Sequence, residues 1–251
     1  MPRFEDEAVV LRAVEWSESS QIVTLLTRTH GKVRGLAKGS KRQSPSSVQR
    51  FTGGFELLTV GQVTATTRPS TELATVTEWD LLDAHPHLRR SLARQRVGFV
   101  AASYVDALTA DEDPHEALYD AVRAVLGGGG DDDSDAVAGS AGLLAFQWAL
   151  LSEVGYRPEL AADVRTGAEL ALTEAGRYTF DPQAGGFTAE RGDDRWRVRG
   201  ETLALLRGVA GGESIDAGAA GVTVGRANRL LTSYVRELIG RELPTMGLVL
   251  G

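Results

Sequence analysis

Seven basic side chains occur within one stretch of the sequence that holds no acidic residue. No Asp or Glu lies between Glu18 and Glu56, although acidic residues (34) outnumber Lys and Arg (27) in the whole chain. A window of this length would lack acids by chance roughly one time in two hundred. Such a run of cations suits neutralisation of a polyanion, above all a nucleic-acid backbone. We call Ser19–Arg50 the basic run, and its cations are Arg28, Lys32, Arg34, Lys38, Lys41, Arg42 and Arg50.

A second interpretation of the basic run stays open, in which it forms a solvated strand face balanced by acids from elsewhere in the chain. Aromatic side chains that could stack on bases are sparse. The N-terminal candidates are Trp16, Phe51, Phe55 and Trp79, and each is predicted to lie in the core rather than on a stacking surface. Few stacking side chains and many cations predict that nucleic acid is bound mainly through its phosphates. Such binding depends little on base sequence and strongly on salt concentration.

Other patterns that could carry chemistry fail on spacing. Gly35–Lys41 is one residue shorter than a phosphate loop and ends Gly-Ser-Lys instead of Gly-Lys followed by Ser or Thr. His85 and His87 flank a proline with only Asp83 nearby, which favours a surface pair over a metal site. Asp131–Asp133 lie on a Gly-rich linker that cannot hold them for acid–base work. With no Cys in the chain, we predict a protein that is not an enzyme and uses no metal or cofactor.

The basic run should be carried by short strands. Five or so strands in about 80 residues predict a closed or nearly closed barrel, because closure removes exposed sheet edges. An OB-type barrel is the first choice and an SH3-like barrel the second. A polar loop is expected over residues 39–54, and the predicted strands are Glu7–Trp16, Gln21–Thr29, Lys32–Ala37, Phe55–Val60, Gln62–Thr67 and Ser70–Trp79.

From Asp83 the hydrophobic period changes from two to about 3.6, which predicts a mainly helical second domain. We therefore expect an α+β protein with an OB-fold domain at residues 1–82 and a helical domain at residues 83–251. Residues 127–135 (GGGGDDDSD) are predicted to be a linker between helices. Residues 156–199 are predicted to be a small hairpin insertion. The expected helices are His85–Leu108, one opening at Asp113–Pro114, Ala136–Val154, Glu201–Val209 and Val224–Glu242.

Composition restricts where nucleic acid could bind. The net charge is −7, so the protein cannot coat nucleic acid with its whole surface and any contact must be local. The acidic N-terminus does not fit a secretory signal, and no apolar run approaches the length of a membrane span. We expect a cytoplasmic protein without membrane contact.

The segment AVVLRAVEWSESSQIVTLLTRTHGKVRGLAKGSKR resembles the opening of the bacterial recombination mediator RecO family. LLSEVGYRPEL and parts of the last helix also resemble this family, so the likeness covers most of the chain. The resemblance implies an OB barrel, a helical C-terminal domain, strand annealing, recombinase loading in the nucleoid, and partnership with RecR and single-strand binding protein. The matching residues of the basic run are Thr27, Gly31, Lys32, Ala37, Lys38 and Gly39.

The insertion departs from that family in one respect. Many members carry two Cys-x-x-Cys pairs that bind zinc there. The positions that match those pairs are Asp163 with Thr166, and Ala189 with Gly192. Because these side chains cannot form a zinc site, the resemblance implies a hairpin that survives without metal.

A partner site is predicted at the start of the helix His85–Leu108. Arg89, Arg90, Arg94 and Arg96 alternate there with apolar residues. This combination suits a short acidic tail that ends in a hydrophobic residue, which the resemblance identifies with the C-terminal tail of single-strand binding protein. Alternatively, these arginines pair with acids of neighbouring helices. The predicted contact residues are Leu88, Arg90, Leu92 and Arg94.

Together these observations favour a non-enzymatic mediator of recombinational DNA repair that binds single- and double-stranded DNA and anneals complementary strands. The rival interpretation is a protein-interaction adaptor whose basic barrel binds an acidic protein partner. Salt-dependent binding of single-stranded DNA by the barrel separates the two.

Overall fold

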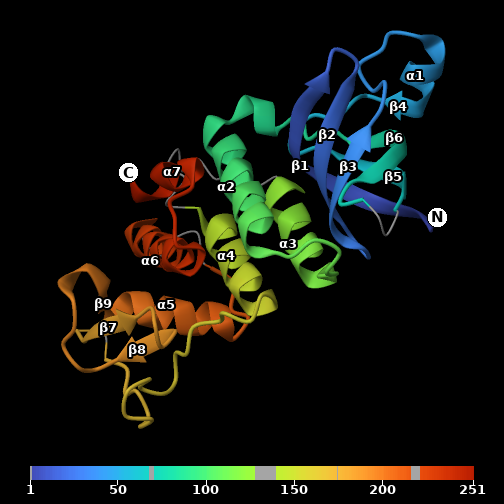
Figure 1. Cartoon of the computed structure of the whole chain (residues 1–251). Helices are drawn as coiled ribbons and strands as arrows, with labels where there is room; N and C mark the ends of the chain where they lie inside the picture. The colour runs from blue at the N-terminus through green and yellow to red at the C-terminus, as the bar shows by residue number, and fades with distance from the viewer. Residues whose placement is uncertain (1, 68–70, 128–139, 174, 216–220) are drawn as a thin grey trace. The chain divides into compact units, whose positions relative to one another are not determined.

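The computed structural model describes residues 2–67, 71–127, 140–173, 175–215 and 221–251. The N-terminal strands follow the order β3-β2-β1-β5-β6-β4, and β3 also pairs in parallel with β6, which closes a five-stranded barrel (Figure 1). This closure confirms the predicted OB-type barrel. The strands are β1 (Arg3–Ser17), β2 (Ser20–Thr27), β3 (Gly31–Ala37), β4 (Phe51–Thr52), β5 (Val60–Thr66) and β6 (Ala74–Asp83).

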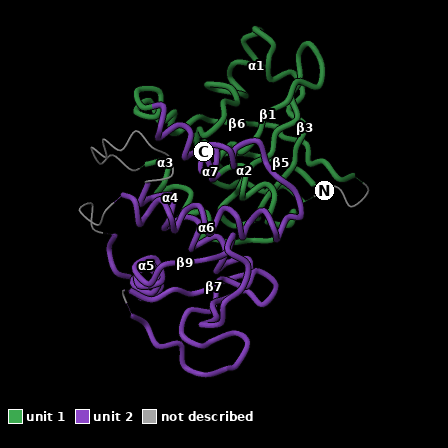
Figure 2. Tube along the Cα trace, turned by 90° about the vertical axis from the view of Figure 1, so that its left-hand side faces the viewer, with its two compact units in different colours: residues 1–91, 102–127 green, residues 92–101, 128–251 purple. Residues whose placement is uncertain are grey.

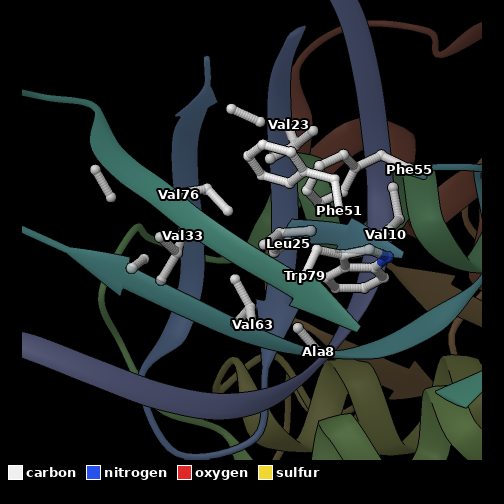
Figure 3. Close-up of a cluster of buried hydrophobic side chains, with 13 residues drawn as sticks. Ala8, Val10, Val23, Leu25, Val33, Phe51, Phe55, Val63, Val76 and Trp79 are labelled. Carbon is white, nitrogen blue, oxygen red and sulfur yellow. The ribbon is translucent and has the colours of Figure 1, made fainter. Parts of the chain in front are cut away.

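The barrel interior is filled by side chains that alternate along the strands. Val10, Leu25 and Val63 are among the fully buried members of this core, and Figure 3 shows them with the ring of Trp79. The ring centroid of Phe55 lies 4.9 Å from that of Trp79. Burial of each large apolar side chain contributes about 1.5–3 kcal/mol to folding. The core therefore fixes which strand faces remain outside.

Two segments of the barrel differ from their prediction. The polar loop predicted over residues 39–54 contains a short helix, α1 (Pro45–Arg50), because a proline in the first turn is already in helical geometry. Phe55–Val60 is not a strand: Leu58 has φ 67°, a left-handed conformation that interrupts an extended chain. The strand prediction that begins at Ser70 lies partly outside the described residues, and β6 begins at Ala74.

The second half is mainly helical, as predicted. A three-stranded sheet of order β8-β7-β9 interrupts the helices, in the region of the predicted hairpin insertion. Within the described ranges, no helix is long and apolar enough to cross a membrane. The elements are η1 (Leu88–Arg90), α2 (Leu92–Leu108), α3 (Glu116–Gly127), α4 (Ala141–Glu153), β7 (Arg177–Asp181), β8 (Gly186–Thr188), η3 (Asp194–Trp196), β9 (Arg197–Arg199), α5 (Gly200–Ala210), α6 (Gly221–Ile239), η4 (Pro244–Met246) and α7 (Gly247–Leu250).

Helix boundaries required correction at three places. The predicted helix Val224–Glu242 is α6 (Gly221–Ile239), which ends before Gly240 because that residue is in the left-handed conformation (φ 71°). The predicted helix His85–Leu108 is divided at Ser91, whose backbone is extended (φ −132°, ψ 111°), so α2 begins at Leu92. The helix expected to open at Asp113–Pro114 begins at Glu116. The predicted linker, apart from Gly127, and the first four residues of the predicted helix Ala136–Val154 lie outside the described residues.

Figure 2 colours two compact units of the chain. Unit 1 comprises residues 1–91 and 102–127, and unit 2 comprises residues 92–101 and 128–251. Unit 1, which contains the barrel, therefore also includes the second half of α2 and all of α3. The predicted domain boundary after residue 82 stays a prediction.

Candidate nucleic-acid interface

The β2–β3 hairpin divides the basic run between its two ends. Thr27 pairs with Gly31 at one end, and Gln21 pairs with Ala37 at the other. Six residue steps of about 3.4 Å separate these pairs by roughly 20 Å along the strand. We call them the turn end and the open end. Arg28 and Lys32 belong to the turn end, Arg34 lies exposed along β3, and Lys38, Lys41, Arg42 and Arg50 belong to the open end.

Lys32 at the turn end is buried, with 7% of its surface exposed. Its Nζ donates hydrogen bonds to the backbone carbonyls of Asp106 and Thr109, both at 2.8 Å. The carboxylate of Asp111 lies 3.4 Å from the same Nζ. This ammonium therefore caps the end of α2, where carbonyls lack helical partners and attract cations. The predicted phosphate contact at Lys32 is corrected accordingly, because its charge is already bound within the fold.

The other turn-end residues also serve the fold. Thr27 Oγ1 donates to the Gly31 carbonyl (2.8 Å) and accepts from the His30 N–H (3.1 Å). Gly31 has φ +71°, and a Cβ there would lie 2.2 Å from the Asp113 carbonyl oxygen. The Glu112 N–H donates to the Lys32 carbonyl at 2.9 Å. The hairpin turn is thus fastened to the connection between α2 and α3.

Two acidic residues from outside the basic run also contact residues of the turn end. Asp6 is 6% exposed, and its Oδ2 accepts from the N–H and the hydroxyl of Thr29 (2.8 and 2.9 Å). Burial opposes ionisation of Asp6, but contacts with His30 and Thr29 outweigh it and lower the pKa of this carboxyl. Arg28 pairs with Asp120 at 3.2 Å. Acids from elsewhere in the chain therefore balance this end, as the second interpretation expected, but Lys32 is buried and not part of a solvated face.

At the open end, exposed cations surround a groove of about 410 Å³. Lys38, Arg42 and Arg50 line it together with the indole of Trp16. Within the described ranges, these three cations have no ion-pairing carboxylate. The groove also contacts Ser17, Ser20, Leu36 and Gly39, and we call it the Trp16 groove.

Backbone hydrogen bonds hold the cationic loop beside the β1–β2 turn. The Lys41 N–H donates to the Ser19 carbonyl at 3.1 Å. Gly39, with φ +76°, donates its N–H to Ser20 Oγ at 3.2 Å. Helix α1 then delivers Arg50, whose guanidinium lies 5.4 Å from the Phe51 ring centroid. The backbone of the cationic loop is therefore held beside the β1–β2 turn.

Trp16 is 64% exposed, so its predicted place in the core is wrong. Phe51, Phe55 and Trp79 are buried as predicted, at 6% exposure or less. The reason lies in the pairing of β1, which pairs with β5 only as far as Val9 and continues to Ser17 against β2 alone. Trp16 stands on this two-stranded extension, beyond the closed barrel. Its position directly before the polar turn Ser17–Ser20 was the available sequence signal.

Lys41 differs from its neighbours because it has a carboxylate partner. Its Nζ forms an ion pair with Glu15. The hydrogen bond and the charge of Lys41 lower the pKa of the Glu15 carboxyl. Both side chains are substantially exposed, so the pair is screened by water and contributes little to stability. Its effect on a ligand is to reduce the positive charge beside the Trp16 groove.

The predicted partner residues are not alike in exposure. Leu88 is 5% exposed and Leu92 is 60% exposed. Arg90 is exposed and Arg94 is half-buried. Leu88 and Arg90 belong to unit 1, whereas Leu92 and Arg94 belong to unit 2. Leu88 therefore offers no apolar surface to a partner.

In the insertion, a carboxylate joins the two turns that the resemblance placed at a zinc site. Asp163 Oδ1 accepts from the N–H groups of Arg165 and Thr166 (2.9 and 3.1 Å), and Oδ2 accepts from Thr188 Oγ1 and the Ala189 N–H (both 2.8 Å). These bonds, led by that of Ala189, hold the pKa of Asp163 well below its usual range. The described residues contain no cluster of three or more His, Cys, Asp or Glu that could bind a metal.

Family profiles match both halves of the chain. The profile described as "Recombination protein O N terminal" matches residues 1–85, and that described as "Recombination protein O C terminal" matches residues 89–246.

Curated relatives agree with these profiles. A DNA repair protein RecO of Anaeromyxobacter sp. (strain Fw109-5) is 33% identical over 96% of this chain and 93% of its own length. The protein of the same name from Anaeromyxobacter dehalogenans (strain 2CP-C) is 32% identical over 97% of this chain and 94% of its own. That of Symbiobacterium thermophilum is 32% identical over 74% and 70%.

Proposed function

Because the chain belongs to the RecO family of DNA repair proteins, we propose that it binds DNA at the Trp16 groove and anneals complementary strands. The observation that carries this proposal is that one exposed indole lies with three cations at the open end of the hairpin, and that these cations have no ion-pairing carboxylate among the described residues. An indole face stacks on any base, and cations neutralise phosphates irrespective of sequence. Both contacts suit single strands.

Annealing requires only that the protein neutralises the phosphates of the strands, and it does not require recognition of the bases. Lys38, Arg42 and Arg50 lower the repulsion between a bound strand and an incoming one. Trp16 stacks on one base and leaves neighbouring base edges free. Base pairing then supplies all sequence specificity, and no chemical step is required of the protein. The same cations bind duplex phosphates, so double-stranded DNA is a ligand too.

Recombinase loading on single-stranded DNA, with RecR and single-strand binding protein as partners, completes the proposed role. We propose that Arg90, Leu92 and Arg94 contact the acidic C-terminal tail of single-strand binding protein. Leu88 is buried and is no longer included among these contacts. A tail peptide titrated against wild type and Arg90→Ala tests this: a several-fold weaker complex supports the contact, and equal affinity removes Arg90 from it.

DNA binding is tested by the fluorescence of Trp16. The other tryptophans, Trp79, Trp148 and Trp196, are at most 9% exposed, so quenching by a short oligothymidylate should report on Trp16. The variant Lys38→Ala/Arg42→Ala should bind about ten-fold more weakly at low salt. Its salt slope, which is the steepness with which the logarithm of the binding constant falls with the logarithm of the salt concentration, should decrease by about 1.4 on single strands. Trp16→Phe should lose the quenching while retaining most of the affinity.

Arg3→Ala/Arg28→Ala is the matched control. Arg3 and Arg28 are cations of the same barrel but are paired with Glu78 and Asp120, and neither of them lines the Trp16 groove. The control should keep wild-type affinity and slope. If both double variants weaken binding equally, the Trp16 groove is not the site. Binding of an acidic protein with no DNA binding at all would favour the adaptor interpretation.

A further inference from the structure

Unit 2 contains a hollow of about 320 Å³ lined by five arginines. Arg195, Arg197 and Arg199 alternate with the buried Trp196 and Val198. Within β9 the alternation follows from strand geometry, in which successive residues face opposite sides, whereas Arg195 precedes the strand in η3. Arg226 and Arg229 reach the same hollow from α6, where residues three apart share a face. The sequence RWRVRG carries this alternation, which was the signal for a second basic site outside the basic run. We call it the arginine hollow.

Carboxylates balance only part of this charge. Arg195 lies 3.4 Å from Glu237, Arg226 lies 3.2 Å from Glu201, and Arg197 pairs with Asp194. Within the part of the chain that the structure describes, Arg199 and Arg229 have no carboxylate partner. The hollow therefore keeps two guanidinium groups available to an anion.

Two further observations indicate a ligand. Thr202 borders the hollow and is 1% exposed, yet among the described residues its Oγ1 has no hydrogen-bond partner. A buried hydroxyl without a partner is costly, and a ligand oxygen would satisfy it. In addition, Arg177 of β7 lies directly opposite Arg199 of β9. Like charges at opposed positions destabilise a strand pair, and an anion bound at Arg199 would reduce that cost.

We propose that the arginine hollow binds the phosphates of a second nucleic-acid strand. This inference rests on the proposed function, since annealing requires the protein to hold two strands. Alternate residues on β9 are about 6.6 Å apart, which suits successive phosphates of an extended strand. Each guanidinium can donate two parallel hydrogen bonds to a phosphate.

The hollow is less suited to an acidic peptide that needs an apolar anchor. Its large apolar lining residues, Trp196 and Leu230, are only 4% and 9% exposed. The Arg195 guanidinium lies 5.3 Å from the Trp196 ring centroid and covers part of that ring. The guanidinium groups of the hollow match the phosphates of a phosphodiester backbone.

The test is the full-length variant Arg199→Gln/Arg229→Gln. Its matched control is Arg157→Gln/Arg241→Gln, which removes two exposed arginines of unit 2 that do not line the hollow. Protein carrying one oligothymidylate strand is offered a second, labelled strand that is not complementary. We expect Arg199→Gln/Arg229→Gln to capture the second strand about ten-fold less, with a salt slope lower by about 1.4. Quenching of Trp16 by the first strand should stay at the wild-type level.

Capture equal to that of the control would overturn the proposal. An oligoglutamate peptide is the second probe: if Arg199→Gln/Arg229→Gln loses the peptide but keeps the second strand, the hollow is a peptide site and the proposal fails. If DNA does not quench Trp16 and Lys38→Ala/Arg42→Ala binds DNA with wild-type affinity, the proposal that DNA binds at the Trp16 groove is wrong. Loss of DNA capture in Arg199→Gln/Arg229→Gln would even then support the arginine hollow.

Discussion

The turn end and the open end of the β2–β3 hairpin carry the same kind of charge in different surroundings. Lys32 at the turn end is 7% exposed and hydrogen-bonded to two carbonyls at the end of α2. Lys38 at the open end is exposed and lines the Trp16 groove. The partners of the two turn-end cations come from residues 106–120, far along the chain. The cations of a charge run in sequence therefore stay available to a ligand only where no other segment of the fold supplies their counter-charges.

Glycine replacement should show the largest difference between the two ends. Gly31 and Gly39 have nearly equal φ angles, +71° and +76°, so alanine carries a similar conformational cost of about 1 kcal/mol at each. Only Gly31→Ala also drives a Cβ to within 2.2 Å of the Asp113 carbonyl oxygen, whereas the nearest atom at Gly39 is 3.5 Å away. We expect Gly31→Ala to lower the unfolding free energy by about 3 kcal/mol or more in urea denaturation. Equal losses in the two variants would mean that the turn is not fastened to the α2–α3 connection.

Replacement of a lysine should give the next largest difference in unfolding free energy between the two ends. Lys32→Met should cost about 2 kcal/mol of unfolding free energy, because two carbonyls and Asp111 lose their cation. Lys38→Met should change stability by less than about 0.5 kcal/mol but should weaken DNA binding.

Amine labelling checks the same contrast without mutation. The lysines of the chain are Lys32, Lys38 and Lys41. A reagent that modifies amines in the native protein should label Lys38 and Lys41 and spare Lys32. Rapid labelling of Lys32 would contradict its buried role, and DNA should protect Lys38.

The sequence predicted the barrel better than it predicted the site. Alternating strands and the absence of helical period indicated closure correctly, since those patterns follow from local geometry. They could not show that Lys32 is buried, because its partners Asp106 and Thr109 are more than 70 residues away. The exposure of Trp16 depends on where β5 stops pairing with β1. Tertiary pairing, rather than propensity, decided both outcomes.

Acid should weaken the turn end selectively. The pKa of Asp6 is lowered in the folded protein from its ordinary value of 3.8, so its stabilising contribution is fully present above that value. It is lost as the pH falls through the lower, folded value. Asp6→Asn should cost about 1–2 kcal/mol near neutral pH, and the gap from wild type should close below about pH 3.8. Denaturation midpoints from pH 6 to pH 2.5 measure this, and a gap that widens on acidification would contradict it.

The smallest expected effect distinguishes two cations within the open end itself. Lys41 is paired with Glu15, whereas Lys38 has no such partner in the described residues. A phosphate that approaches Lys41 must displace a carboxylate, so the net gain in attraction is small. Lys41→Ala should therefore weaken single-strand binding by less than about three-fold, and less than Lys38→Ala does. Removal of the competitor in Glu15→Gln should strengthen binding by a comparable factor and steepen the salt slope, because Lys41 then releases a counterion of its own on binding. Salt titrations of the three variants measure these changes. If Glu15→Gln leaves both affinity and slope unaltered, Lys41 lies outside the path of the DNA, and the interface narrows to Trp16, Lys38, Arg42 and Arg50.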